Sequence, residues 1–276
     1  MMEQQFQLLH PAHCPQGTVR AAVFDFDGTF STLRCGWEKV MEPLMLEMIS
    51  GKSAAEADAA LCRRVADYID SSTGIQTIYQ MQWLKEQADA AGCGHPERDA
   101  WWYKAEYNRR LMQQVQGRLD ALERGASAPE EYLVAGSVDF LRALQGQGVE
   151  LYLASGTDHK DVLREAAALG VQDAFTEIKG APEHVAACSK EAVIRMILEE
   201  KGLRGQELLL VGDGKVEIAL GAGCGAYTLG AATDEEHRRG FNPVKARRLI
   251  AAGADALTGD FTETERLMAW VNGGAV

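Results

Sequence analysis

The chain has 276 residues, of which 46% are hydrophobic and 25% charged, so it can bury a sizeable core and is long enough for two domains. Its formal net charge of −12 argues against a nucleic-acid partner, which the negative surface would repel. No signal peptide and no apolar run near the roughly 20 residues of a membrane span is evident. Six scattered cysteines lack a metal-binding spacing and are interpreted as reduced thiols. We therefore expect a cytoplasmic protein with no membrane partner, whose oligomeric state the sequence leaves open.

The most informative segment is an apolar strand pattern at residues 18–24 that runs directly into Asp25, Asp27, Gly28 and Thr29. Two aspartates two positions apart on a strand point the same way, and they repel each other unless a cation lies beside them. An acidic turn closing a hairpin is the alternative, but it needs a second alternating strand after Gly28. Residues 30–37 and the helical pattern after them do not supply one. The segment therefore predicts a reactive strand end with a bound metal ion.

Two more strand patterns end in polar residues. Residues 149–154 run into Ser155 and Gly156, which open a helix and suit the binding of a phosphate oxygen. Residues 207–211 run into Asp213, with Glu217 one helical turn further on, and Lys190 opens the helix that precedes this strand. In an open α/β sheet, ligands bind at the carboxyl ends of the strands. These side chains are therefore expected to meet at one edge.

On these residues the chain resembles the haloacid dehalogenase superfamily of phosphohydrolases. The four motifs of that family occur in order as Asp25 to Thr29, Ser155, Lys190, and Asp213 with Glu217, although many relatives carry Asp at the last position. The resemblance implies an α/β fold, a Rossmann-like parallel sheet core in a three-layer sandwich, with an all-helical cap domain. It places the core in residues 1–30 and 130–276 and the cap in residues 31–129. It also implies that the backbone carbonyl of Asp27 ligates the metal.

The chemistry can be argued from the side chains themselves. Asp25 can attack phosphorus and form an aspartyl-phosphate, while Asp27 can protonate the leaving oxygen and later activate water. Each close pair of negative charges costs about 4 kcal/mol at 4 Å and an effective dielectric near 20. We expect Lys190 and a divalent cation to offset that cost. Lys179, at a strand end, is the second candidate for the lysine.

Hard carboxylate oxygens in a sparse set favour an octahedral ion that keeps several waters, so Mg²⁺ is the expected cofactor. Asp25, Asp213 and Glu217 are the candidate side-chain ligands, and a solvated helix position is the alternative for Glu217.

Between the first two strands the pattern is helical, at residues 36–49, 53–70, 75–91 and 97–124. One apolar stripe is expected to form the core of the cap: Tyr103, Tyr107, Leu111, Val115, Leu119 and Leu122. Arg34 and Trp37, where the chain enters the cap, are expected to contact the substrate together with Gly28, Ser155 and Gly156. The loop at residues 71–74 is a further candidate of the cap, although an ordinary helix–helix turn is the preferred interpretation. His10, His13 and Cys14 are expected to lie in a frayed N-terminal segment, although they could in principle bind a metal.

The C-terminal part predicts strands at residues 226–230 and 254–257, with a helix at residues 242–252 between them.

The sequence as a whole predicts a Mg²⁺-dependent phosphatase of a small phosphorylated metabolite, such as a sugar phosphate or a phosphoglycolate-like compound. Within the resemblance, the acid at Asp27 favours a phosphomonoester substrate. The alternatives are a phosphomutase of the same superfamily, or a non-catalytic phosphate-binding or scaffold protein. The physiological substrate does not follow, because cap residues select it.

Overall fold

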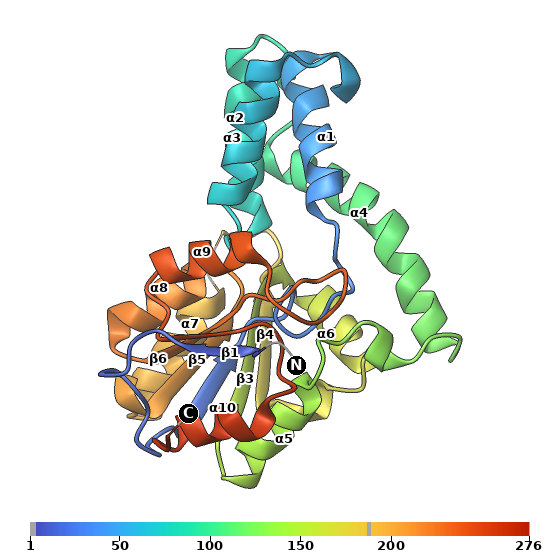
Figure 1. The fold of residues 1–276 in the computed structure, drawn as a ribbon. Helices are drawn as coiled ribbons and strands as arrows, with labels where there is room; N and C mark the ends of the chain where they lie inside the picture. Colours follow the sequence, from blue (N-terminus) through green and yellow to red (C-terminus); the bar gives the residue numbers. More distant parts are fainter. Residues whose placement is uncertain (1–3, 187–188, 276) are drawn as a thin grey trace.

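The computed structural model describes residues 4–186 and 189–275. Its lower part is a sheet between helices, and a group of helices rises above one end of that sheet (Figure 1). Within the described residues the sheet has the strand order β1-β7-β6-β5-β2-β3-β4, and only the β1–β7 pair is antiparallel. The strands are β1 (Phe6–Leu8), β2 (Ala21–Phe24), β3 (Glu150–Asp158), β4 (Glu177–Ala181), β5 (Leu208–Gly212), β6 (Tyr227–Ala231) and β7 (Ala256–Thr258).

Helices cover both faces of the sheet. One face carries α5 (Ser137–Gly146), α6 (His159–Ala168) and α10 (Thr264–Val271), and the other carries α7 (Ser189–Arg195), α8 (Lys215–Cys224) and α9 (Pro243–Ala251). Alternate residues of β2 point to opposite faces of the sheet and pack against these two sets of helices. Phe24 packs with Phe140 of α5, whereas Val23 belongs to the cluster of Val193 on α7. A strand buried on both faces needs a continuous apolar sequence, which β2 and β5 have. The predicted three-layer α/β fold class is confirmed.

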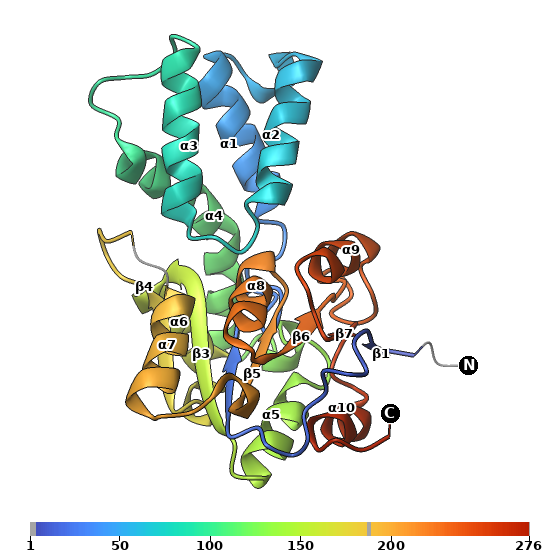
Figure 2. The same ribbon diagram turned by 90° about the vertical axis from the view of Figure 1, so that its left-hand side faces the viewer.

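Four helices form an insert between β2 and β3, as Figure 2 shows from the side. They are α1 (Glu38–Ser50), α2 (Ala59–Ser71), α3 (Thr77–Ala90) and α4 (Ala100–Glu123). The second helix begins later than predicted because Asp58, with extended backbone, caps it by accepting hydrogen bonds from the amides of Ala60 and Leu61. Short 3₁₀ turns lie at Ala54–Glu56, Pro129–Glu131, Gln172–Ala174 and Gly205–Glu207, and a π-helical turn at Met196–Glu200 follows α7.

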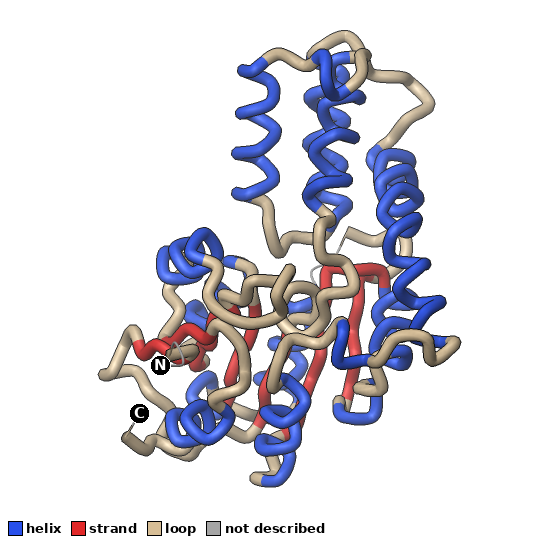
Figure 3. Tube along the Cα trace, turned by 45° about the vertical axis from the view of Figure 1, so that its right-hand side comes forward, coloured by secondary structure: helices blue, strands red, loops and turns tan. Residues whose placement is uncertain are grey.

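The insert and the sheet share one apolar cluster. Phe30 and Leu33 are fully buried. They belong to the cluster that joins the face of the sheet covered by α5, α6 and α10 to the interior of the insert. The predicted stripe on α4 is buried along its whole length, and α4 runs down the side of the molecule to reach α6 (Figure 3). None of the helices in the described residues is long and apolar enough to cross a membrane.

The N-terminal prediction was wrong. Phe6–Leu8 pairs with β7 instead of fraying, and Nδ1 of His13 lies 2.8 Å from a carboxylate oxygen of Asp255. His10, His13 and Cys14 form no metal-binding group with one another in the described part of the chain. A strand of three residues at an antiparallel edge carries too short a pattern to be recognised from the sequence.

Candidate active site

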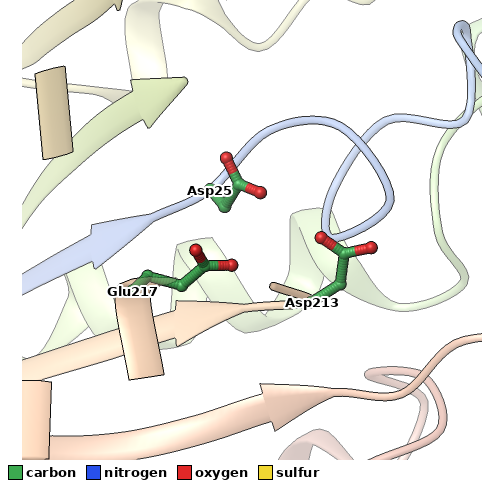
Figure 4. A group of neighbouring side chains, drawn as sticks. All are labelled: Asp25, Asp213 and Glu217. Atoms are coloured by element: carbon green, nitrogen blue, oxygen red, sulfur yellow. The ribbon is translucent and has the colours of Figure 1, made fainter. Parts of the chain in front are cut away.

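Three acidic side chains meet where the central strands end. Asp25 follows β2, whose neighbours are β3 and β5, and its backbone amide donates to the carbonyl of Val211 at 2.9 Å. Asp213 follows β5, and Glu217 lies in the first turn of α8. Figure 4 shows the three carboxylates turned toward a common space. One oxygen of each lies within 4.8 Å of the others, and all three residues are buried.

Lys190 joins two of these acids. Its Nζ lies 3.1 Å from Oδ1 of Asp25 and 2.8 Å from Oε2 of Glu217, and its side chain is only 4% exposed. Lys179 instead pairs with Glu177 at the surface and is 38% exposed. Of the two candidates, the structure therefore places Lys190 beside Asp25.

The cluster holds more negative than positive side chains, and this shifts the pKa values of its members. Burial raises the pKa of Asp25 well above its ordinary value, Lys190 opposes this shift, and the carboxylates of Glu217, Asp213 and Asp27 add to it. Burial lowers the pKa of Lys190, but Asp25 and Glu217 raise it by more, so its pKa lies above the usual range. Lys190 is therefore a permanent cation, and Asp25 would ionise more readily with a second cation nearby.

The donor set fits a hard divalent cation such as Mg²⁺. Gly28 makes room for the Asp213 carboxylate, because a β-carbon there would lie 2.3 Å from Oδ2 of Asp213, and its φ of +76° also favours glycine. Glu217 is held more firmly than Asp25: its Oε1 accepts from the amide of Gly214 at 2.6 Å and its Oε2 accepts from Lys190. The predicted ligation by the carbonyl of Asp27 stays a prediction.

Asp27 has a different environment from Asp25. Its Oδ2 accepts hydrogen bonds from Thr157 Oγ1 at 2.8 Å and from Ser155 Oγ at 3.3 Å. Its Oδ1 has no hydrogen-bond partner in the described part of the chain. Burial raises the pKa of Asp27, and the Arg34 guanidinium and, to a smaller extent, the hydrogen bond from Thr157 oppose the shift. A carboxyl group in this setting can keep a proton on Oδ1 and donate it.

Arg34 and Trp37 both line the pocket above these residues, where they were predicted. The guanidinium of Arg34 is already bound, because its Nη2 donates to Oε1 of Glu165 at 2.6 Å and its Nε lies 3.0 Å from the same oxygen. Its Nε also lies 3.9 Å from Oδ1 of Asp27. Burial raises the pKa of Glu165 to about 7, and Arg34 opposes that shift. Arg34 therefore links α6 to Asp27.

The loop between α2 and α3 is part of the site, so its interpretation as an ordinary turn was wrong. Thr73, Gly74 and Ile75 line the pocket. A β-carbon on Gly74, whose φ is +88°, would lie 3.2 Å from Cα of Gly214, and one on Gly156 would lie 3.4 Å from the carbonyl oxygen of Ile75. The loop therefore contacts the backbone after β5 and the predicted phosphate-binding residues of β3.

Several residues of the site were missed. Thr157 could have been found, because it lies two positions after Ser155 in β3 and so on the same side of the strand. Tyr107 and Leu111 line the pocket, although the preferred interpretation of their stripe was the core of the cap. No local sequence signal marks the others, which are Ile75, Thr77, Gln80, Glu165, Glu235 and Lys245.

Comparison with known proteins agrees with this geometry. A family model described as haloacid dehalogenase-like hydrolase matches residues 19–225, which include all four motifs. The chain belongs to this family. With the site described above, it is a phosphatase of that family.

Individual relatives are distant. A phosphoglycolate phosphatase from Pectobacterium atrosepticum is 24% identical over 208 residues, which are 75% of this chain and 78% of that protein. The crystal structure of a predicted phosphoglycolate phosphatase from Haemophilus somnus has a TM-score of 0.61 at 17% identity, covering 91% of this chain and 98% of that one. A β-phosphoglucomutase from Clostridium difficile has a TM-score of 0.63 at 14% identity, with 92% and 97% covered. The structural likeness establishes the fold.

Proposed function

We propose that the protein hydrolyses a small phosphomonoester with bound Mg²⁺, through an aspartyl-phosphate on Asp25. The observation that carries this proposal is the placement of Lys190 between Asp25 and Glu217, with the carboxylate of Asp213 beside them. A buried carboxylate next to a permanent cation, at the carboxyl edge of a parallel sheet, is suited to attack on a phosphoryl group.

In the first step, a carboxylate oxygen of Asp25 forms a bond to phosphorus and the bond from phosphorus to the ester oxygen breaks. Asp27 gives the proton on its free Oδ1 to that departing oxygen, so the product leaves as an alcohol. In the second step, Asp27 takes a proton from water, whose oxygen attacks phosphorus and releases inorganic phosphate and the Asp25 carboxylate. Lys190 offsets negative charge on Asp25 and on the phosphoryl oxygens.

Asp25 and Asp213 would hold the Mg²⁺, with Glu217 as a further ligand that already binds Lys190. Bound there, the ion would withdraw negative charge from the phosphoryl oxygens. Ser155 and Gly156, beside Asp27, are the proposed phosphate-binding residues.

We further propose that the helical insert acts as the cap domain, within the predicted residues 31–129, and selects the leaving group. The loop between α2 and α3 supports this role, because it contributes Thr73 and Gly74 to the pocket. The relative from Pectobacterium atrosepticum and the sequence motifs both favour a small phosphorylated metabolite. A sugar phosphate and a phosphoglycolate-like compound are the two substrate classes to compare.

The test is release of inorganic phosphate from a panel of phosphorylated metabolites and from p-nitrophenyl phosphate, with Mg²⁺ and with excess chelator. We expect release that depends on Mg²⁺. Transfer of phosphate between sugar positions without release would favour a phosphomutase, to which the fold is also similar. Binding of phosphate esters without any turnover would favour a scaffold protein and contradict the proposal.

A further inference from the structure

The pocket has two chemically different ends. At the sheet edge it is lined by the residues proposed to act on the phosphoryl group. Under the insert its lining has no charged side chain in the described part of the chain apart from Arg34, and consists of Trp37, Thr73, Gly74, Ile75, Thr77, Gln80, Tyr107 and Leu111. The leaving group must lie at this second end, because the first is filled by the phosphoryl group.

The cations that line the pocket are already committed to acids. Lys190 binds Asp25 and Glu217. Arg34 binds Glu165 at 2.6 Å and lies 3.5 Å from Asp161 and 3.9 Å from Asp27. Neither is therefore a spare positive charge for a second anionic group.

A third lysine next to the pocket is also paired with two acids. Lys245 binds Asp213 at 2.6 Å and Glu235 at 2.5 Å, and Glu235 itself lines the pocket. Arg248 pairs with Asp70 of α2 at 3.4 Å, and its Nη2 donates to the backbone carbonyl of Asp213 at 3.4 Å, so this cation and acid add no net charge to the cluster. The residues outside the described ranges, 1–3, 187–188 and 276, include no lysine or arginine.

Counted together, three cations face seven carboxylates around this pocket, so the cluster carries a formal charge of −4. The cations are Lys190, Arg34 and Lys245, and the acids are Asp25, Asp27, Asp161, Glu165, Asp213, Glu217 and Glu235. A divalent cation, together with the proton that Asp27 carries as the acid, would still leave −1, before the phosphate adds its own charge. An anionic leaving group would be repelled in this environment.

We propose that the leaving group of the substrate carries no negative charge: it is a compact hydroxylated or amine-bearing alcohol, and neither a carboxylate nor a second phosphate. This inference rests on the proposed phosphatase function and narrows it. Thr73 Oγ1 donates to the carbonyl of Ile69 and Gln80 Nε2 donates to Ser72 Oγ, so the oxygens of both side chains can accept hydrogen bonds from hydroxyl groups. The aromatic rings of Trp37 and Tyr107 tolerate an ammonium group. It argues against a phosphoglycolate-like substrate and against the bisphosphate that a phosphomutase must hold.

The experiment compares phosphomonoesters of equal size that differ in charge. Phosphoglycolate is compared with 2-hydroxyethyl phosphate and with O-phosphoethanolamine, and 3-phosphoglycerate with glycerol 3-phosphate, at fixed ionic strength with Mg²⁺. We expect kcat/KM for the better uncharged or amine-bearing ester to exceed that for its carboxylate partner by at least about tenfold. Equal or better turnover of phosphoglycolate and 3-phosphoglycerate would overturn the inference and leave the phosphatase function intact.

If the small esters are not turned over, the same ranking is measured as their inhibition constants against hydrolysis of p-nitrophenyl phosphate, and tighter binding of the carboxylates overturns the inference. No release from any ester, p-nitrophenyl phosphate included, would contradict the proposed function instead.

A variant tests whether the charge of the pocket causes the discrimination between these esters. Glu235→Gln should raise kcat/KM for phosphoglycolate relative to 2-hydroxyethyl phosphate several-fold. Glu236→Gln, on an exposed neighbour paired with Lys39, should leave the ratio unchanged. An unchanged ratio in Glu235→Gln would show that the charge of the pocket does not discriminate.

Discussion

Among single residues, the two lysines that the sequence ranked as first and second candidates have different surroundings. Lys190→Ala removes the cation 3.1 Å from Asp25 and should lower kcat by at least about 10²-fold, the usual effect of losing one electrostatic stabiliser. Lys179→Ala removes only a surface pair with Glu177 and is the matched control. Steady-state kinetics with p-nitrophenyl phosphate measure both. A larger loss in Lys179→Ala would transfer the role to Lys179.

Glu165 should act on catalysis indirectly, by holding Arg34 beside Asp27. Glu165→Gln loosens that contact, so proton donation to the leaving oxygen should suffer. The loss in kcat should be larger with 2-hydroxyethyl phosphate, whose alkoxide needs a proton, than with p-nitrophenyl phosphate, whose phenolate does not. Equal losses on both esters would mean that Glu165 has a purely structural role.

At the scale of elements, the loop between α2 and α3 should set the geometry of the pocket. Gly74→Ala places a β-carbon at a φ of +88° and 3.2 Å from Gly214, so the loop must move away from the site. Gly92→Ala is the control, because its φ of +71° imposes a similar backbone strain but nothing lies within 4 Å of the new atom. Both variants should unfold at a lower temperature, and only Gly74→Ala should lose kcat/KM. Equal kcat/KM in the two variants would contradict this account of the loop.

The ion pair between Arg34 and α6 should make stability depend on pH. Burial raises the pKa of Glu165 to about 7 in the folded chain, above the value near 4.3 of an unfolded glutamate. The folded state then binds more protons at Glu165 between these values, so the contribution of Glu165 to stability is greatest below about pH 4 and is lost as the pH rises through 7.

Relative to Glu165→Gln, the wild type should therefore lose up to about 3 kcal/mol of unfolding free energy between pH 4.5 and 7.5. Urea unfolding of both proteins at several pH values measures the difference. A difference that is constant or grows with pH would show that Glu165 is ionised throughout and held by Arg34.

At the scale of the whole molecule, Mg²⁺ should stabilise the fold, because it binds a site that exists only when the strand ends are brought together. Adding Mg²⁺ should raise the unfolding temperature of the wild type, and NaCl of equal ionic strength should not. Asp213→Asn should abolish most of this rise, and Glu236→Gln should retain it. The same rise in Asp213→Asn as in the wild type would place the metal elsewhere.

Much of this arrangement could be predicted from the sequence, because the carboxyl ends of parallel strands must share one edge. That rule placed Asp25, Ser155 and Asp213 together, and helical periodicity found the four helices of the insert. The four motifs also belong to the family that the comparison identifies.

What the sequence did not predict depends on contacts between distant segments. Glu165 meets Arg34 across 131 positions, and Lys245 reaches Asp213 across 32, with no periodic pattern at either. The loop that holds Gly74 has the composition of any helix–helix turn, and its role follows only from where α2 and α3 carry it. Because of such contacts, the charge of the pocket could be counted only in the structure.

In the proposed mechanism Asp25 carries the phosphoryl group during turnover, and chemical trapping of the acyl phosphate shows whether it does. The enzyme is mixed with substrate and Mg²⁺, quenched in acid within one turnover, reduced with borohydride to convert an acyl phosphate to an alcohol, and digested for mass spectrometry. We expect the modification at Asp25 in the wild type, and its absence in Asp25→Asn. An unmodified Asp25 during measurable turnover, or modification at another residue, would contradict the account.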